Sequence, residues 1–189
     1  MKQIKSIAML LVAALLINVS SFAQKMMNEQ TVEVGGAPMF PSKNIVENAV
    51  NSKDHTTLVA AVKAAGLVET LQSAGPFTVF APTNEAFGML PAGTVESLVK
   101  PENKAKLTGI LTYHVVAGRF GTKELDAKIK EGNGTGELTT VAGGKLWVTK
   151  KAGKYMLKDE NGGWATITIK NVYQSNGVIH VIDHVVLPK

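Results

Sequence analysis

Residues 75–87 read GPFTVFAPTNEAF, and this stretch sets the order of the elements around it. The run from Phe77 to Ala81 is almost wholly apolar, which is typical of a strand buried on both faces. Pro82 has no N–H to donate to a strand ladder and should end the strand. Thr83 follows in the position of a helix N-cap, with Asn84 in the first turn. The stretch therefore predicts a buried strand, a proline stop and a capped helix.

The same corner also suggests an enzymatic hypothesis, with Thr83 as a nucleophile and Asn84 as an oxyanion donor. Acyl transfer would also need a base within hydrogen-bond reach and a group that orients the base. The sequence has no G-x-S-x-G motif, and nothing in it places a histidine against Thr83. Capping explains both residues, so we predict no catalytic residues and keep a hydrolase as a third hypothesis only.

The N-terminus has the features of a secretory signal peptide. Lys2 and Lys5 precede an apolar run over residues 7–19, and Ser21-Phe22-Ala23 supplies small residues at the positions that a signal peptidase reads. We therefore predict a signal peptide over residues 1–23, with cleavage near Ala23. The product is expected to be secreted, in a periplasm or outside the cell.

The rest of the chain divides into a short leader and one domain. Residues 24–41 are polar, contain glycine and show no clear period, so we expect a flexible leader there and a folded domain over 42–189. The chain has no cysteine, which excludes disulfides and a lipid-bearing cysteine after the signal. No second apolar run reaches the roughly 20 residues of a spanning helix, so we expect no transmembrane anchor.

The charge of the chain is mildly positive. The net charge is +5, and without Lys2 and Lys5 the 20 basic residues become 18 against 15 acidic residues, or +3. Few aromatic residues alternate with the late lysines, so we predict no nucleic-acid site. A polyanion patch stays open, although a solvated hairpin face explains the same pattern. The lysines in question are Lys145, Lys150, Lys151, Lys154 and Lys158.

Helices are predicted in the first half of the domain and strands in the second. Apolar residues at helical spacing predict helices near 58–65, 67–71, 94–99, 101–111 and 122–129. Besides the strand at 77–81, we predict a strand at 113–116. After residue 132, glycine and Asn-Gly pairs separate apolar runs, as in tight hairpins, and predict strands at 137–142, 145–150, 154–159, 164–173 and 178–187. This segregation favours an α+β fold.

Three blocks of sequence resemble a known family. GPFTVFAPTNEAF, LTYHVV at 111–116 and NGVIHVIDHVVLP at 176–188 resemble, in order and spacing, three blocks of fasciclin (FAS1) domains. The resemblance covers roughly residues 41–189 and is greatest to small secreted bacterial members with one domain. It implies a wedge of two antiparallel β-sheets flanked by several short helices. It also implies an adhesion or interaction role at cell surfaces or in matrix, with no characteristic cofactor or reaction.

The resemblance also singles out two binding candidates. In animal members, the Tyr-His block is linked to integrin binding, and Tyr113 and His114 match it here. An integrin is not expected as the partner of a bacterial protein, so the resemblance transfers the position and not the partner.

Two tryptophans are further candidates for binding. Trp147 and Trp164 lie in neighbouring predicted strands, as does Tyr155. Exposed rings would form a platform for the apolar faces of sugars, whereas cross-strand packing in a core needs the same residue types. The sequence leaves both interpretations open.

The late histidines do not predict a metal site. In a regular strand, His180 and His184 share a face but lie roughly 13 Å apart, and Asp183 points to the other face. One metal ion with bonds of about 2 Å cannot join them. We predict neither metal ligands nor a cofactor.

These observations lead to one preferred function and one alternative. The preferred hypothesis is a secreted, non-catalytic FAS1 adhesion or interaction module, a monomer, that binds cell-surface or matrix protein or polysaccharide. The alternative is a periplasmic binder of a small or lipid-like ligand. A large apolar pocket would favour the alternative.

Overall fold

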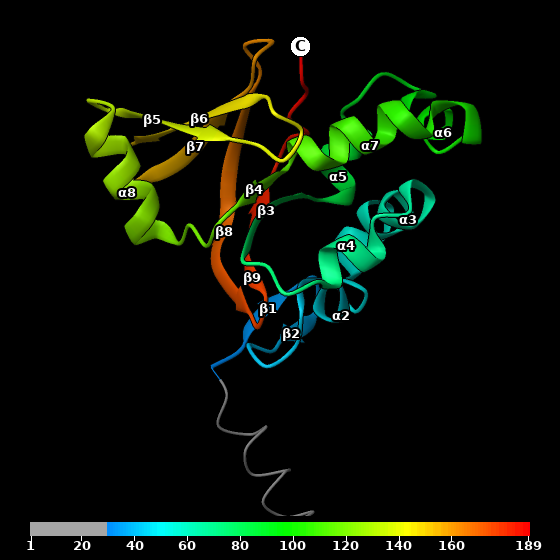
Figure 1. Ribbon diagram of the computed structural model, residues 1–189, viewed down its shortest axis with the longest axis horizontal. Coiled ribbons are helices and arrows are strands. Elements are labelled where there is room, and N and C mark those ends of the chain that lie inside the picture. Colours follow the sequence, from blue (N-terminus) through cyan, green and yellow to red (C-terminus); the bar gives the residue numbers. More distant parts are fainter. Residues whose placement is uncertain (1–29) are drawn as a thin grey trace, which may run out of the picture. The chain divides into compact units, whose positions relative to one another are not determined.

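A computed structural model of the protein describes residues 30–189. The predicted signal peptide, 1–23, and the first part of the predicted leader lie outside the described residues. Figure 1 shows helices α3 to α7 on one side of strands β3, β9 and β8, and helix α8 with strands β5 to β7 on the other. The predicted α+β fold class is confirmed.

Seven strands form the larger sheet, in the order β4-β3-β9-β8-β7-β6-β5. Neighbouring strands are antiparallel except β3 and β9, which are parallel. A smaller sheet pairs β1 with β2. The strands are β1 (Val32–Val34), β2 (Ala37–Met39), β3 (Phe77–Pro82), β4 (Val115–Ala117), β5 (Thr135–Thr139), β6 (Lys145–Lys151), β7 (Lys154–Lys158), β8 (Trp164–Gln174) and β9 (Gly177–Ile182).

The larger sheet curls until its two ends meet. Strand β8 has 11 residues, and its pairing with β9 shifts register twice, between Ile167 and Val172. Such irregularities bend a strand and increase its twist. An isolated bridge between Val116 and Thr140 then joins β4 to the residue after β5. The curl creates an interior on one side of the sheet, which helix α8 covers.

The helices are short and follow the predicted apolar stripes. In α3, Leu58, Ala61 and Ala65 are buried, and Gly66 ends the helix with a left-handed φ of 74°. The helical elements are α2 (Ile45–Ala49), η1 (Lys53–His55), α3 (Thr56–Ala65), α4 (Val68–Gln72), α5 (Asn84–Gly88), α6 (Thr94–Leu98), η2 (Pro101–Asn103), α7 (Lys104–Tyr113) and α8 (Thr122–Glu131).

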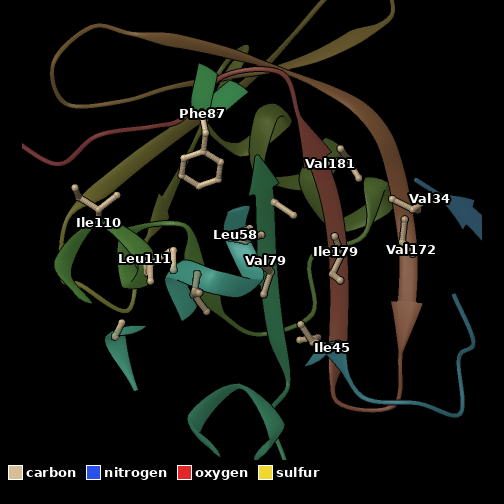
Figure 2. Close-up of a cluster of buried hydrophobic side chains, with 14 of the residues drawn as sticks. Val34, Ile45, Leu58, Val79, Phe87, Ile110, Leu111, Val172, Ile179 and Val181 are labelled. Atoms are coloured by element: carbon tan, nitrogen blue, oxygen red, sulfur yellow. The ribbon is translucent and has the colours of Figure 1, made fainter. Parts of the chain in front are cut away.

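Strands β3 and β9 form a wall between two hydrophobic cores. Val79 and Ile179 point into the first core, where they meet Leu58 and Leu111 from the helices (Figure 2). Phe80 and Ile182 point the other way, into the interior of the curled sheet. A strand with a core on each face is mostly apolar along its length, and this explains the run from Phe77 to Ala81, in which the buried Thr78 hydroxyl donates to the Gly118 carbonyl.

The first ordered strands lie within the range predicted to be a leader. Residues 32–39 form a hairpin, and Val34 and Met39 are buried in the first core. Gly35 and Gly36, with φ of 60° and 73°, make the turn. The folded domain therefore begins before residue 42. The sequence did not reveal this hairpin because its strands have three residues each and bury only Val34, Ala37 and Met39.

Two other segments differ from their predictions. The predicted strand at 113–116 was wrong at its start, because α7 continues to Tyr113 and His114 forms its C-cap. The strand predicted at 178–187 ends at Ile182. Beyond it the chain leaves the sheet, and the Asp183 Oδ1 atom accepts a hydrogen bond from the Thr166 N–H at 2.6 Å.

Candidate binding site

The corner after β3 is built from caps. The Thr83 hydroxyl accepts a hydrogen bond from the Ala86 N–H at 3.2 Å and caps α5, as predicted. The Asn84 Oδ1 atom accepts from the Thr57 N–H at 2.9 Å, and its amide donates to the Lys53 carbonyl at 2.8 Å. Asn84 thus caps α3 from a distant part of the chain. Both side chains have structural partners, and these explain the residues without any catalytic role.

Tyr113 lies in the interior of the curled sheet and is 0% exposed. Its hydroxyl donates to the Lys145 carbonyl at 2.6 Å and accepts from the Glu160 N–H at 3.2 Å. Burial raises the pKa of Tyr113 to about 12. The ring therefore joins α7 to strand β6 and to the turn after β7, and it offers no surface to a partner in this conformation.

His114 is also buried, with 2% of its surface exposed. Its Nδ1 atom lies 2.8 Å from the Ile110 carbonyl, and its Nε2 atom lies 3.2 Å from the Val186 N–H. The first contact needs a proton on Nδ1 and the second a lone pair on Nε2, so the ring is held neutral. Burial lowers the pKa of His114 to about 4. His114 fastens the segment after β9 to the end of α7.

Asn176, at the start of the third sequence block, also binds backbone groups of distant elements. Its Oδ1 atom accepts from the Ile45 N–H at 3.0 Å, and its amide donates to the carbonyls of Leu71 and Ser73 at 2.8 and 2.9 Å. One buried side chain thus ties together the start of α2, the end of α4 and the loop before β9. The sequence places Asn176 in an Asn-Gly turn at the start of the third block but does not predict these contacts.

The late histidines lie apart and have separate partners. His180 is buried in β9, where its Nε2 atom lies 2.8 Å from the Phe120 carbonyl. His184 lies beyond the strand and is exposed, with Nδ1 2.8 Å from the Asp183 carboxylate. Over residues 30–189, no group of three histidine, aspartate or glutamate side chains is arranged to hold a metal ion.

Trp147 and Trp164 lie on one face of the sheet. The register places Trp147 of β6 opposite Lys158 of β7, and the same lysine opposite Trp164 of β8. The three residues form a row across three strands, with the two tryptophans about 10 Å apart at their α-carbons. We call this row, together with Thr135 and Thr149 beside it, the tryptophan platform.

The tryptophan platform surrounds a shallow hollow of about 320 Å³. Trp164 is 39% exposed and Trp147 is half-buried. The Lys151 and Lys158 ammonium groups lie over the Trp164 ring, 4.8 and 5.8 Å from its centre. Leu146 and Val148, on either side of Trp147 in β6, are buried on the opposite face.

The charges on this face are mostly positive. Lys145 forms an ion pair with Glu137, with a distance of 2.9 Å between Nζ and Oε1. Lys151, Lys154 and Lys158 are exposed, and within residues 30–189 no carboxylate lies at ion-pair distance from any of them. The arrangement joins apolar rings, hydroxyl groups and unpaired ammonium groups.

A second hollow opens on the helical side of the sheet. It is an apolar crevice of about 80 Å³ between α2, α3, α4 and β3, lined by side chains such as Val62, Leu71 and Val79. His55 also lines it. The His55 Nδ1 atom lies 2.9 Å from the Ser52 hydroxyl, while Nε2 faces the Ala81 carbonyl without forming a hydrogen bond of normal geometry. Burial lowers the pKa of His55, so this ring is also neutral.

Comparisons with known proteins agree with this architecture. The family model described as the Fasciclin domain matches residues 53–188. Protein sll1483 of Synechocystis is 47% identical over 168 residues, which cover 89% of this chain and 86% of that protein. Immunogenic protein MPB70 of Mycobacterium bovis is 37% identical over 145 residues, 74% of this chain and 66% of MPB70.

One solved structure shows the same fold. It is a FAS1 domain pair from the insect cell adhesion molecule Fasciclin I, with a TM-score of 0.69 and 20% sequence identity. The match covers 78% of this chain and 52% of the insect chain, so this chain spans about half of the domain pair.

Proposed function

The chain belongs to the fasciclin (FAS1) family, and from this premise we propose that it is an exported, non-catalytic interaction module that binds cell-surface or extracellular matrix material through its tryptophan platform. The observation that carries the proposal is the row of Trp147, Lys158 and Trp164 on one exposed face. The adhesion role named for the insect structure supports it by analogy.

The tryptophan platform suits a glycan ligand. Indole rings offer flat apolar surface to the C–H faces of sugars, and buried aromatic anchors dominate many binding energies. The Thr135 hydroxyl and the lysine beside the rings can exchange hydrogen bonds with sugar hydroxyls, whereas the buried Thr149 hydroxyl already donates to the Gly134 carbonyl at 2.9 Å. Tyr113 and His114 have no such role in our proposal, because their polar atoms already bind the fold's own backbone.

The non-catalytic part of the proposal rests on the partners of the reactive side chains. The best nucleophile candidate, Thr83, caps a helix, and the buried histidines bind backbone groups or, for His55, a serine hydroxyl. A nucleophile needs a base within hydrogen-bond reach, and none of these contacts pairs a hydroxyl nucleophile with a base and an orienting carboxylate.

The export part of the proposal rests on residues 1–23. Within the described residues, no helix is long and apolar enough to cross a membrane. We expect the protein recovered from the periplasm or the medium to begin at Gln24, which mass spectrometry of its N-terminal peptide can establish. An intact Met1 N-terminus on protein retained in the cytoplasm would contradict export.

The binding experiment compares three proteins. The purified protein is titrated onto intact bacterial cells and onto their extracellular polysaccharide, beside a Trp147→Ala/Trp164→Ala variant and a Tyr173→Ala control. Tyr173 is an aromatic residue of β8 with a similar exposure, 41%, away from the hollow. We expect saturable binding that the double variant loses and the control retains. Equal binding by all three proteins would overturn the proposal.

The apolar crevice carries the second candidate function, the binding of a small aliphatic ligand, but its volume of about 80 Å³ is well below the roughly 300–1,000 Å³ of ordinary ligand pockets, so only a short aliphatic group fits. The test is a calorimetric titration with a short-chain fatty acid. A Val62→Phe variant should fill the crevice and abolish binding, whereas Val50→Phe, at an exposed position outside it, should not. No binding to the unsubstituted protein would exclude this function for that ligand class.

A further inference from the structure

The lysines around the tryptophan platform carry positive charges that a neutral sugar would not neutralise. Lys151, Lys154 and Lys158 carry no carboxylate partner within the described part of the chain, although they lie on one face of two paired strands. The carboxylate on this face, Glu137 of β5, is already paired with Lys145. Like charges so close together repel one another, and an anionic ligand would relieve that repulsion.

The strand register places these ammonium groups near the two tryptophans. Lys158 lies between the two tryptophans in the row, and Lys151 and Lys154 are directly opposite each other near the end of the same hairpin. Lys151 and Lys158 both place an ammonium group over the Trp164 ring. A ligand that stacks on Trp164 would therefore meet both ammonium groups, which lie over the ring.

From this arrangement we propose that the tryptophan platform binds an acidic polysaccharide, with sugar rings on Trp147 and Trp164 and the carboxylates of uronic-acid units on Lys151, Lys154 and Lys158. The inference rests on the proposed function and names its ligand class. Each ammonium–carboxylate contact is a charge-assisted hydrogen bond, which is stronger than its neutral counterpart.

A sugar polymer suits the site better than a nucleic acid does. The two tryptophans are about 10 Å apart at their α-carbons, a spacing that suits sugars separated by one intervening unit of an extended chain better than successive stacked bases. Thr135 also lines the hollow and offers a hydroxyl to a sugar, whereas the Thr149 hydroxyl donates to the Gly134 carbonyl. The chain without Lys2 and Lys5 has a net charge of only +3, so the attraction is local to this face.

The experiment measures the affinity of the purified protein for four polymers at about 0.15 M salt, where long-range attraction is screened. The polymers are polygalacturonate, a neutral dextran, polyglutamate and single-stranded DNA. Two variants are compared: Lys151→Gln/Lys158→Gln, and a control, Lys104→Gln/Lys106→Gln, which makes the same change in net charge on helix α7.

We expect polygalacturonate to bind best. The platform variant should weaken this binding about tenfold or more, which corresponds to the loss of charged hydrogen bonds, while the control stays near the unsubstituted protein. Trp147→Ala/Trp164→Ala should also weaken it. Far-UV circular dichroism and thermal unfolding of each variant confirm that the fold is retained.

Five outcomes would overturn the inference. Dextran binding as tight as polygalacturonate binding would leave the proposed function standing with a neutral ligand. Equal losses in both lysine variants, or equally tight binding of polyglutamate, would indicate generic charge attraction. Tighter binding of DNA would favour a nucleic acid. If the unsubstituted protein binds cells but none of the four polymers, an acidic polysaccharide is not its ligand. If it does not bind cells at all, the proposed function is wrong.

Discussion

The three blocks that resemble FAS1 domains and the tryptophan platform use their side chains in opposite ways. In the blocks, His114 and Asn176 are buried and Asn84 is half-buried, and polar atoms of all three bind backbone groups of distant elements. On the platform, Trp164 and Lys158 point outward, and the lysine has no carboxylate partner within residues 30–189.

This difference separates the residues that define the fold from those available for binding. A buried polar atom without a partner costs free energy, so the blocks need specific amides and imidazoles at fixed positions. On an exposed face, water satisfies the polar groups, so the residues there are free to contact a ligand. The motif that identifies the family therefore need not be the surface that binds a partner.

The largest expected effect is on stability, from Asn176→Ala. The variant leaves the Ile45 N–H and the Leu71 and Ser73 carbonyls without their side-chain partner. We expect the free energy of unfolding to fall by about 3 kcal/mol or more, measured by urea denaturation. Asn161→Ala is the matched control, because this exposed amide binds only the Leu187 and Pro188 carbonyls. If Asn176→Ala lowers the free energy of unfolding no more than Asn161→Ala does, the proposed difference between the blocks and the platform is wrong.

The second effect is a dependence of stability on pH. His114 has a folded-state pKa of about 4 against an ordinary value of 6.5, so the unfolded chain binds more protons between these values. Stability should be full above pH 6.5 and fall as the pH drops toward 4, by about 3 kcal/mol from this residue. Urea denaturation across this range measures it.

A His114→Gln variant sharpens the pH experiment. It should be less stable at pH 7 but should lose less stability between pH 6.5 and 4. Some dependence should remain, because burial also lowers the pKa of His55 and His180. An unchanged pH dependence in the variant would mean that His114 is not held neutral by the fold.

A smaller loss of stability is expected from Tyr113→Phe. The change keeps the buried ring but removes the hydroxyl that serves the Lys145 carbonyl and the Glu160 N–H. We expect a loss of about 2 kcal/mol in the free energy of unfolding, with binding to extracellular polysaccharide unchanged. Weaker binding at full stability would instead place Tyr113 in the binding surface.

The smallest effect on stability should come from Trp164→Ala. The ring is 39% exposed and packs against lysine side chains, so we expect a change below about 1 kcal/mol. Binding to extracellular polysaccharide should nevertheless fall about tenfold or more, because aromatic anchors dominate such interfaces. Isothermal calorimetry and urea denaturation of the same preparation separate the two quantities.

Much of the fold followed from local patterns. The apolar run at Phe77–Ala81, the stripe of α3 and the Thr83 cap all depend on residues close in sequence, and the structure confirms them. The prediction of a strand from Tyr113 was wrong because the aromatic and branched residues of this segment are typical of a strand. The contact that opposes this, from His114 Nδ1 to the Ile110 carbonyl, is invisible in a sequence pattern.

The candidate site was only partly predictable. The sequence identified Trp147 and Trp164 but could not say which face of the sheet they occupy. Their alignment with Lys158 depends on the register of two successive hairpins, which the turns and the buried face of Leu146 and Leu157 set together. The bridging role of Asn176 depends on contacts with residues more than 100 positions away.

The most direct test measures binding and stability side by side for Trp164→Ala and Tyr113→Phe, using extracellular polysaccharide as the ligand. Our account predicts that Trp164→Ala loses binding and keeps its stability, whereas Tyr113→Phe loses stability and keeps its binding while folded. The reverse pattern would contradict it, because the binding surface would then lie at the Tyr-His block and not on the tryptophan platform.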